Sequence, residues 1–86
     1  MLPVKADGFY VIRARVVHAG QSRHARWIDL ENKMAIRIPN ADLRYFQTMD
    51  FTKLKGRVIT AQGWVHTWSK GDRVMVVRYP TAIWFD

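Results

Sequence analysis

The stretch GWVHTWSKGDR, residues 63–73, places two tryptophans and a histidine at alternate positions, followed by a short basic turn. Alternate side chains of a β-strand point to the same face of a sheet. Trp64, His66 and Trp68 would therefore lie side by side. They would form either a surface on which an aromatic ligand stacks or the apolar side of a small domain, and the surrounding elements decide which.

Residues that could catalyse a reaction or bind a metal ion form no recognised pattern. The three histidines, His18, His24 and His66, lack the spacing of metal ligands, and the chain has no cysteine. Ser22 and Ser69 both fall in predicted turns, where serine has an ordinary structural role. No Ser-His-Asp order, phosphate loop or nucleotide fingerprint is present. We therefore expect no catalytic residues, no metal site, no cofactor and no enzymatic activity.

Basic and aromatic residues, in contrast, recur in several segments of the chain. Guanidinium and ammonium groups hold phosphates, and aromatic faces stack on bases of any sequence. The candidate nucleic-acid-binding residues are Arg23, His24, Arg26, Trp27, Lys33, Arg37, Trp68, Lys70 and Arg73. In the alternative interpretation, the arginines are a solvated strand face and Trp27 closes one end of the fold.

Composition supports an anionic partner for a single small domain. The 86 residues include 14 Lys and Arg against 7 Asp and Glu, a formal charge of +7, which favours nucleic acid first and a membrane surface second. The same charge would also keep a small domain soluble. No apolar run reaches the length of a membrane span, and the first ten residues contain no signal-peptide core. A complete chain would be cytoplasmic, whereas an excised domain leaves the compartment open.

Period-two alternation predicts three strands in the first half of the chain, over residues 8–20, 21–32 and 33–39. Residues 40–48 change period and predict one short helix, with Asn40 as its N-cap. Residues 50–56 read as a linker that turns at Gly56.

Two more strands follow, over residues 57–68 and 73–85, and Pro80 bends or interrupts the second. Three strands, a helix and two strands predict an all-β, five-stranded Greek-key barrel, the OB-fold, over residues 1–86. An SH3-like barrel or a split sheet is the structural alternative. Residues 1–7 are expected to be a flexible or capping segment. The predicted interior residues are Ile12, Ala14, Val16, Ile28, Leu30, Met34, Ile36, Ile38, Ile59, Ala61, Val65 and Val77.

The fourth strand has one small apolar face, residues 59, 61, 63 and 65, that suits the inside of a tight barrel. Trp64 and His66 then face outward, where the helix or the chain ends could still cover Trp64. Trp68 adjoins the loop between the last two strands, which commonly borders the ligand groove in OB-folds. We therefore expect Trp68 to contact a ligand.

The segment from Leu54 to Phe85 resembles a bacterial OB-like module found in thermonuclease-related proteins. The matching residues are Gly56, Ile59, Ala61, Gly63, Trp64, Val65, Tyr79, Pro80 and Ile83. The earlier segments VIRARVVHAGQSRHARWIDL and AIRIPNADL resemble the opening strands and the helix start of that module. The resemblance implies a companion module without nuclease activity, because the clustered carboxylates of the nuclease are missing here.

The sequence thus predicts a non-catalytic module that binds single-stranded DNA or RNA with little sequence preference. Arg23, Arg26, Lys33, Arg37, Lys70 and Arg73 are expected to form one positive surface. Two other functions stay open, a protein–protein interaction module and a structural appendage of a larger protein, because a fold alone does not choose among them. The sequence does not define the oligomeric state.

Overall fold

The computed structural model describes residues 7–31, 33–46, 49–68 and 72–85 of the chain. Its strands are β1 (Gly8–Gln21), β2 (Ala25–Leu30), β3 (Met34–Pro39), β4 (Val58–Thr67), β5 (Arg73–Val76) and β6 (Ile83–Phe85). Its short 3-10 helices are η1 (Asn40–Phe46), η2 (Phe51–Lys53) and η4 (Pro80–Ala82). Of the N-terminal segment predicted over residues 1–7, the first six residues lie outside the described part.

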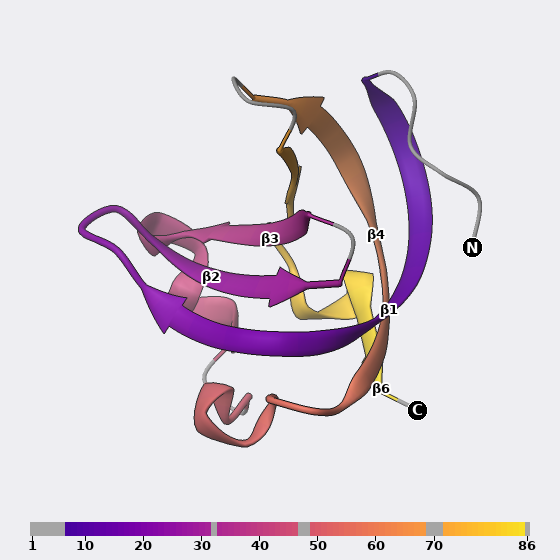
Figure 1. Ribbon diagram of the computed structural model, residues 1–86. Helices are drawn as coiled ribbons and strands as arrows, with labels where there is room; N and C mark the ends of the chain where they lie inside the picture. The colour runs from indigo at the N-terminus through magenta and orange to yellow at the C-terminus, as the bar shows by residue number, and fades with distance from the viewer. Residues whose placement is uncertain (1–6, 32, 47–48, 69–71, 86) are drawn as a thin grey trace.

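The first five strands close into a barrel in the order β1–β2–β3–β5–β4, with β4 pairing back to β1. All of these pairings are antiparallel except that of β3 with β5, which is parallel. Figure 1 shows β1 curving along its length so that it borders β4 near its start and β2 near its end. This is the Greek-key topology of the OB-fold. The all-β barrel predicted from the sequence is confirmed, rather than the SH3-like or split-sheet alternative.

The curvature of β1 lets one strand belong to two sides of the barrel. Residues 8–15 pair with β4, and residues 16–21 pair with β2. The register shifts between Val16 and His18, which leaves Val17 without a partner in the ladder. Such a bulge bends the strand and increases its twist.

Two glycines are required by the backbone geometry of this barrel. Gly56 has φ +87°, a left-handed conformation that glycine adopts at no steric cost, and it forms the predicted turn before β4. At Gly63 a Cβ atom would lie 3.0 Å from the carbonyl oxygen of Val76 and 3.0 Å from Cγ of Met75. β4 therefore passes close to β5 only because residue 63 lacks a side chain.

The predicted faces of the strands agree with the core. Every predicted interior residue is buried except Ala14, which is partly buried and packs against the core. Several further buried residues were not among the predicted interior residues: Ala25 at the start of β2, Phe46 in η1, Leu54 after η2, Val74 and Met75 in β5, and Ile83 at the start of β6. Phe46 and Leu54 extend the core beyond the strands, because the chain between β3 and β4 packs against the barrel.

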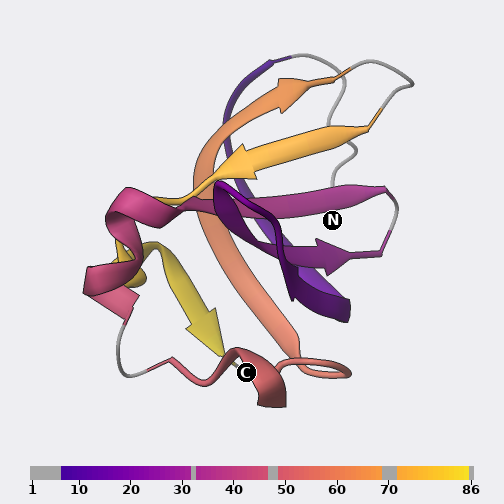
Figure 2. The same ribbon diagram turned by 90° about the vertical axis from the view of Figure 1, so that its left-hand side faces the viewer.

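The helical segment starts where predicted, and it is a 3-10 helix over Asn40–Phe46, whereas residues 47 and 48 lie outside the described part. Figure 2 shows η1 at the end of β3 away from the β2–β3 turn. The side chain of Asn40 donates to the carbonyl oxygen of Arg23 at 2.9 Å, so it ties the β1–β2 loop to η1. The predicted linker contains η2, whose N-cap Asp50 accepts hydrogen bonds from Thr52; these bonds lower the pKa of Asp50.

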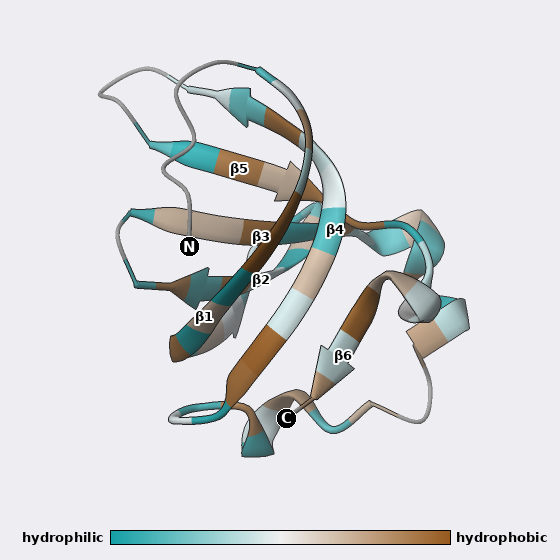
Figure 3. Ribbon diagram, turned by 90° about the vertical axis from the view of Figure 1, so that its right-hand side faces the viewer, coloured by the Kyte–Doolittle hydropathy of each residue, from teal (hydrophilic) through white to brown (hydrophobic). Residues whose placement is uncertain are grey.

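The predicted fifth strand is interrupted near Pro80, as its sequence indicated. It divides into β5, the η4 turn and β6. β6 pairs with the first half of β4, where β5 does not reach. Figure 3 shows β4 between β1 and β6 on this side of the molecule.

Candidate functional site: an aromatic groove on the barrel face

Two tryptophans that are 41 positions apart in the sequence lie against each other on the barrel surface. The ring centroids of Trp27, in β2, and Trp68, directly after β4, are 5.5 Å apart, and the ring planes meet at 82°, an edge-to-face arrangement. The indole N–H of Trp27 donates to Oγ of Ser22 at 2.9 Å. The backbone N–H of Trp68 donates to the carbonyl oxygen of Asp72 at 2.7 Å. The first bond holds the Trp27 ring, the second holds the backbone of Trp68, and the Trp68 ring rests against Trp27.

A groove lies beside this pair of tryptophans. Trp27 lies opposite Gly20 on β1 and opposite Arg37 on β3. The imidazole of His18 lies beside Gly20, since a Cβ atom added to Gly20 would be only 3.0 Å from Cε1 of His18. The groove has a volume of about 520 Å³, and its lining residues are His18, Gly20, Gln21, Trp27, Asp29, Leu30, Lys33, Met34, Ala35, Trp68, Asp72, Arg73 and Val74.

Charges of both signs line the groove. Lys33 and Arg73 lie beside each other at one end, because the backbone N–H of Arg73 donates to the carbonyl oxygen of Lys33 at 3.2 Å. Asp29 and Asp72 balance these two cations. Nδ1 of His18 lies 3.5 Å from Oδ2 of Asp29, which is an ion pair when the imidazole is protonated. The groove thus offers aromatic and hydrogen-bonding surface rather than a purely positive one.

Arg37 provides a cation on the face beside the groove. It lies opposite both Trp27 and Val76 in the strand register and is partly buried. Cross-strand neighbours on one face have Cβ atoms about 4.5–5.5 Å apart, so Arg37 lies next to the indole of Trp27. Within the described residues, no carboxylate pairs with its guanidinium group.

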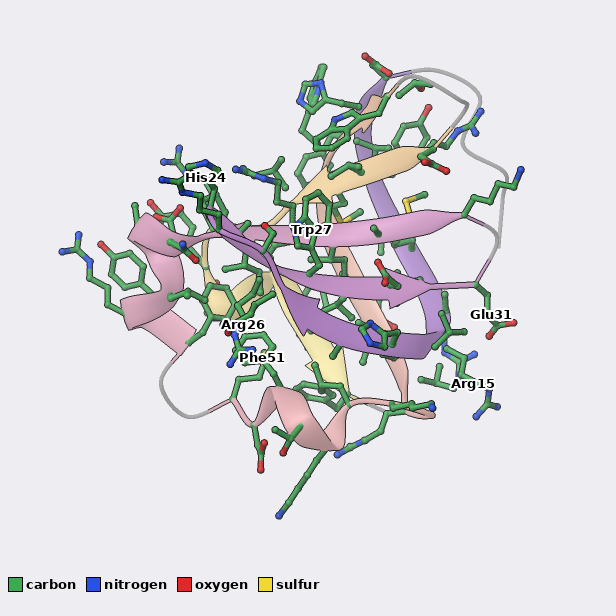
Figure 4. The ribbon with its side chains drawn as sticks, turned by 60° about the vertical axis from the view of Figure 1, so that its left-hand side comes forward. Arg15, His24, Arg26, Trp27, Glu31 and Phe51 are labelled. Carbon is green, nitrogen blue, oxygen red and sulfur yellow. The ribbon has the colours of Figure 1, made fainter. Side chains whose placement is uncertain are left out.

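Arg26 was predicted to join this surface, and the structure places it elsewhere. Ile28 points into the core, and the strand alternation therefore turns Arg26 to the same side as Ile28 and away from Trp27. Its guanidinium carbon lies 4.8 Å from the centroid of the Phe51 ring, a cation–π contact at η2. Figure 4 shows Arg26 directed toward Phe51, below the strand that carries Trp27.

The remaining predicted residues lie farther from the groove or outside the described residues. Arg23 and His24 are exposed in the β1–β2 loop, where the backbone N–H of Asn40 donates to the carbonyl oxygen of His24 at 2.9 Å. Figure 4 shows His24 on this loop, beyond Trp27. Lys70 lies outside the described residues. Of the six cations predicted to share one surface, Lys33 and Arg73 line the groove and Arg37 is beside it.

The alternation of Trp64, His66 and Trp68 does not produce one aromatic surface. Trp64 and His66 are neighbours on the outer face of β4, with ring centroids 6.0 Å apart, and Trp64 is 50% exposed. β4 ends at Thr67, so Trp68 lies beyond the strand and contacts Trp27 instead. Trp64 lies opposite Phe9, and this pair faces another part of the barrel surface.

Sequence reasoning missed several groove residues: His18, Gln21, Asp29 and Asp72. The sequence could have placed Asp29 at the groove, because strand alternation puts its side chain on the same side of β2 as that of Trp27. His18 and Gln21 are placed by the bulge and register of β1, which period-two patterning does not specify.

The described lining residues include no serine, threonine or cysteine that could act as a nucleophile beside His18 and Asp29. Among the described residues, no group of three histidine or acidic side chains is close enough to hold a metal ion. No helix in the described part is long and apolar enough to cross a membrane.

The chain matches no protein-family model and no curated protein. The resemblance to the thermonuclease-related module therefore stays a prediction.

Proposed function

We propose that this protein is a non-catalytic OB-fold module that binds single-stranded DNA or RNA with little sequence preference. The observation that carries the proposal is the pair of partly exposed tryptophans, Trp27 and Trp68, in a groove bordered by Lys33, Arg37 and Arg73. Stacking surfaces beside cations are the combination that holds single strands.

The shape of the groove favours unpaired bases over a duplex. Its volume, about 520 Å³, is that of a small-ligand pocket. A base within a duplex is already stacked on both faces and cannot also stack on an indole. Base–aromatic stacking tolerates every base, which accounts for the weak sequence preference in the proposal.

The balanced charges of the groove define how a strand would lie. Asp29 and Asp72 would repel a phosphate inside the groove, whereas the base itself is uncharged. In the proposed complex the bases therefore enter the groove, and the phosphates face Arg37 on one side and the Lys33–Arg73 end on the other. The number of phosphate contacts is small, so affinity should be modest and should depend on salt.

Fluorescence anisotropy of labelled oligonucleotides tests this proposal. We expect a short single strand to bind the protein at low salt, with affinity falling as salt is raised, and the matching duplex to bind more weakly. Equal binding of the two forms would contradict the stacking mechanism. No anisotropy change at high micromolar protein and low salt would refute nucleic-acid binding.

Protein binding is a second candidate function, supported by a different surface. Phe9, Val11, Trp64 and Trp84 are exposed on the outer face of the β1–β4–β6 side. In the strand register, Trp64, Gln62 and Thr60 alternate along one face of β4. They lie opposite Phe9, Val11 and Trp84, respectively, so these aromatic and apolar side chains share that face. Exposed apolar patches often mark protein interfaces. If oligonucleotides fail to bind, this face becomes the leading candidate site, and its interactions should change little with salt.

A further inference from the structure

The dipeptide Arg-Tyr occurs twice in the chain, at residues 44–45 and 78–79, and the fold brings the two copies together. The ring centroids of Tyr45 and Tyr79 are 5.6 Å apart, with ring planes tilted by 46°. The guanidinium carbon of Arg44 lies 4.9 Å from the centroid of the Tyr45 ring. The same group donates to the Tyr45 hydroxyl at 2.9 Å.

A buried carboxylate holds the second copy in place. Asp42, in η1, is 8% exposed, and its Oδ2 lies 3.3 Å from Nε of Arg78. Arginine has five N–H donors, so this contact leaves the terminal nitrogens of Arg78 available. The side chain of Arg78 is 66% exposed and can therefore meet a ligand from solvent.

The exposure of the two rings indicates a binding surface rather than packing alone. Tyr79 is 59% exposed and Tyr45 is 43% exposed. Rings that served only to pack η1 against the end of β5 would be expected to bury more of their surface, because burial is what stabilises a core aromatic. Two exposed rings and two exposed arginines in one cluster offer stacking for bases and donors for phosphates.

The strand register connects this cluster, through Arg37, to the groove on the barrel face. The backbone N–H of Val77 donates to the carbonyl oxygen of Arg37 at 2.9 Å, and Arg37 lies opposite Trp27. Two strand spacings of about 4.8 Å and three residues of about 3.3 Å each place Tyr79 roughly 14 Å from Trp27. At about 3.4 Å per nucleotide, as in a duplex strand, roughly four nucleotides span this distance, and a strand whose bases are unstacked spans it with fewer.

We propose that Arg44, Tyr45, Arg78 and Tyr79 form a second nucleotide-binding position, which takes the same single strand after it leaves the Trp27–Trp68 groove. This inference rests on the proposed function, and it adds the path of the strand across Arg37. It predicts that only oligonucleotides long enough to reach both positions use the tyrosines.

The test compares oligonucleotides of about 2 and about 12 nucleotides by NMR titration at low salt, with the full chain. Tyr79→Ala should weaken binding of the longer strand by about fivefold or more and should change binding of the shorter one by less than about twofold. Tyr79→Phe keeps the ring and should bind like the unaltered protein. Phe9→Ala removes an aromatic side chain that is 62% exposed on another part of the surface, and it is the matched control.

The outcomes separate this inference from the proposed function. If Trp68→Ala weakens binding and Tyr79→Ala binds both strands as tightly as the unaltered protein, the second position is refuted and the groove stands. If Tyr79→Ala lowered the affinity for the short and the long oligonucleotide equally, the second position would also be refuted, because the effect would not depend on the strand being long enough to reach Tyr79. If the unaltered protein binds neither strand, both proposals fail. Circular dichroism melting checks that each variant is folded.

Discussion

Replacing Trp68 by alanine separates ligand stacking from structural packing. Trp68 is 48% exposed, so about half of its surface contacts the protein. A tryptophan buries about 150–250 Å² when enclosed, and half of that, at about 25 cal/mol per Å², gives a loss of roughly 2–3 kcal/mol in the free energy of unfolding. Domains are stable by about 5–15 kcal/mol, so Trp68→Ala should remain folded.

The same substitution should also weaken binding of the single strand, because it removes a stacking surface. Stacking on one aromatic side chain is worth about 1–3 kcal/mol per base, which corresponds to a loss of affinity of about five- to 150-fold. Anisotropy titration of a labelled single strand measures this loss, and urea denaturation measures the change in stability. Trp68→Phe keeps an aromatic face and should recover part of the affinity.

Trp64→Ala is the matched control because Trp64 has nearly the same exposure, 50%, on another part of the surface. We expect it to bind the single strand as the unaltered protein does. If Trp68→Ala is folded and binds with unchanged affinity, or if Trp64→Ala weakens binding equally, the stacking argument is wrong.

Three further substitutions test the electrostatics, the packing and the pH dependence of the fold. Arg37→Ala should lower affinity for all sequences and reduce the slope of log affinity against log salt by about 0.7, the value for one phosphate contact on a single strand; an unchanged slope would contradict a phosphate contact. Gly63→Ala should lower the free energy of unfolding by about 1–3 kcal/mol in urea denaturation, because the added Cβ lies 3.0 Å from the carbonyl oxygen of Val76. Hydrogen bonds from Thr52 lower the pKa of Asp50 below its usual 3.8 in the folded state, so the charged carboxylate stabilises the fold above that pH and loses this effect as pH falls through the lowered pKa. Asp50→Asn should therefore be less stable than the unaltered protein near neutral pH, and the difference should disappear in acid; a difference that persists in strong acid would contradict this cause.

The strands and their buried faces could be predicted because alternation is a local property of the sequence. Ile36 and Ile59 lie in runs whose period is two, and both are fully or almost fully buried, as predicted. Phe46 and Leu54 were not predicted to be buried, because they lie in segments between the strands, where residues do not alternate with a period of two. The division of the last strand was indicated by Pro80, but the pairing of β6 with β4 depends on where β5 ends.

The candidate site was predictable in part. Trp27 and Trp68 were both expected at the groove, but their mutual contact depends on strand order, which brings distant segments together. Arg26 was grouped with the groove on the basis of charge, although the burial of Ile28 and the strand period already indicate the opposite side. The pairing of Tyr45 with Tyr79 arises from the packing of η1 beside the end of β5, and no local pattern in the sequence indicates it.

The four indole N–H groups of the chain offer the most direct test of the central claim. Trp27 and Trp68 border the groove, whereas Trp64 and Trp84 are exposed on the β4–β6 side of the barrel. In a 1H–15N NMR spectrum each indole gives its own signal, which single substitutions assign. Addition of a single-stranded oligonucleotide should shift the signals of Trp27 and Trp68 and leave those of Trp64 and Trp84 in place. Shifts confined to Trp64 and Trp84, or no shifts at all, would contradict binding at the groove.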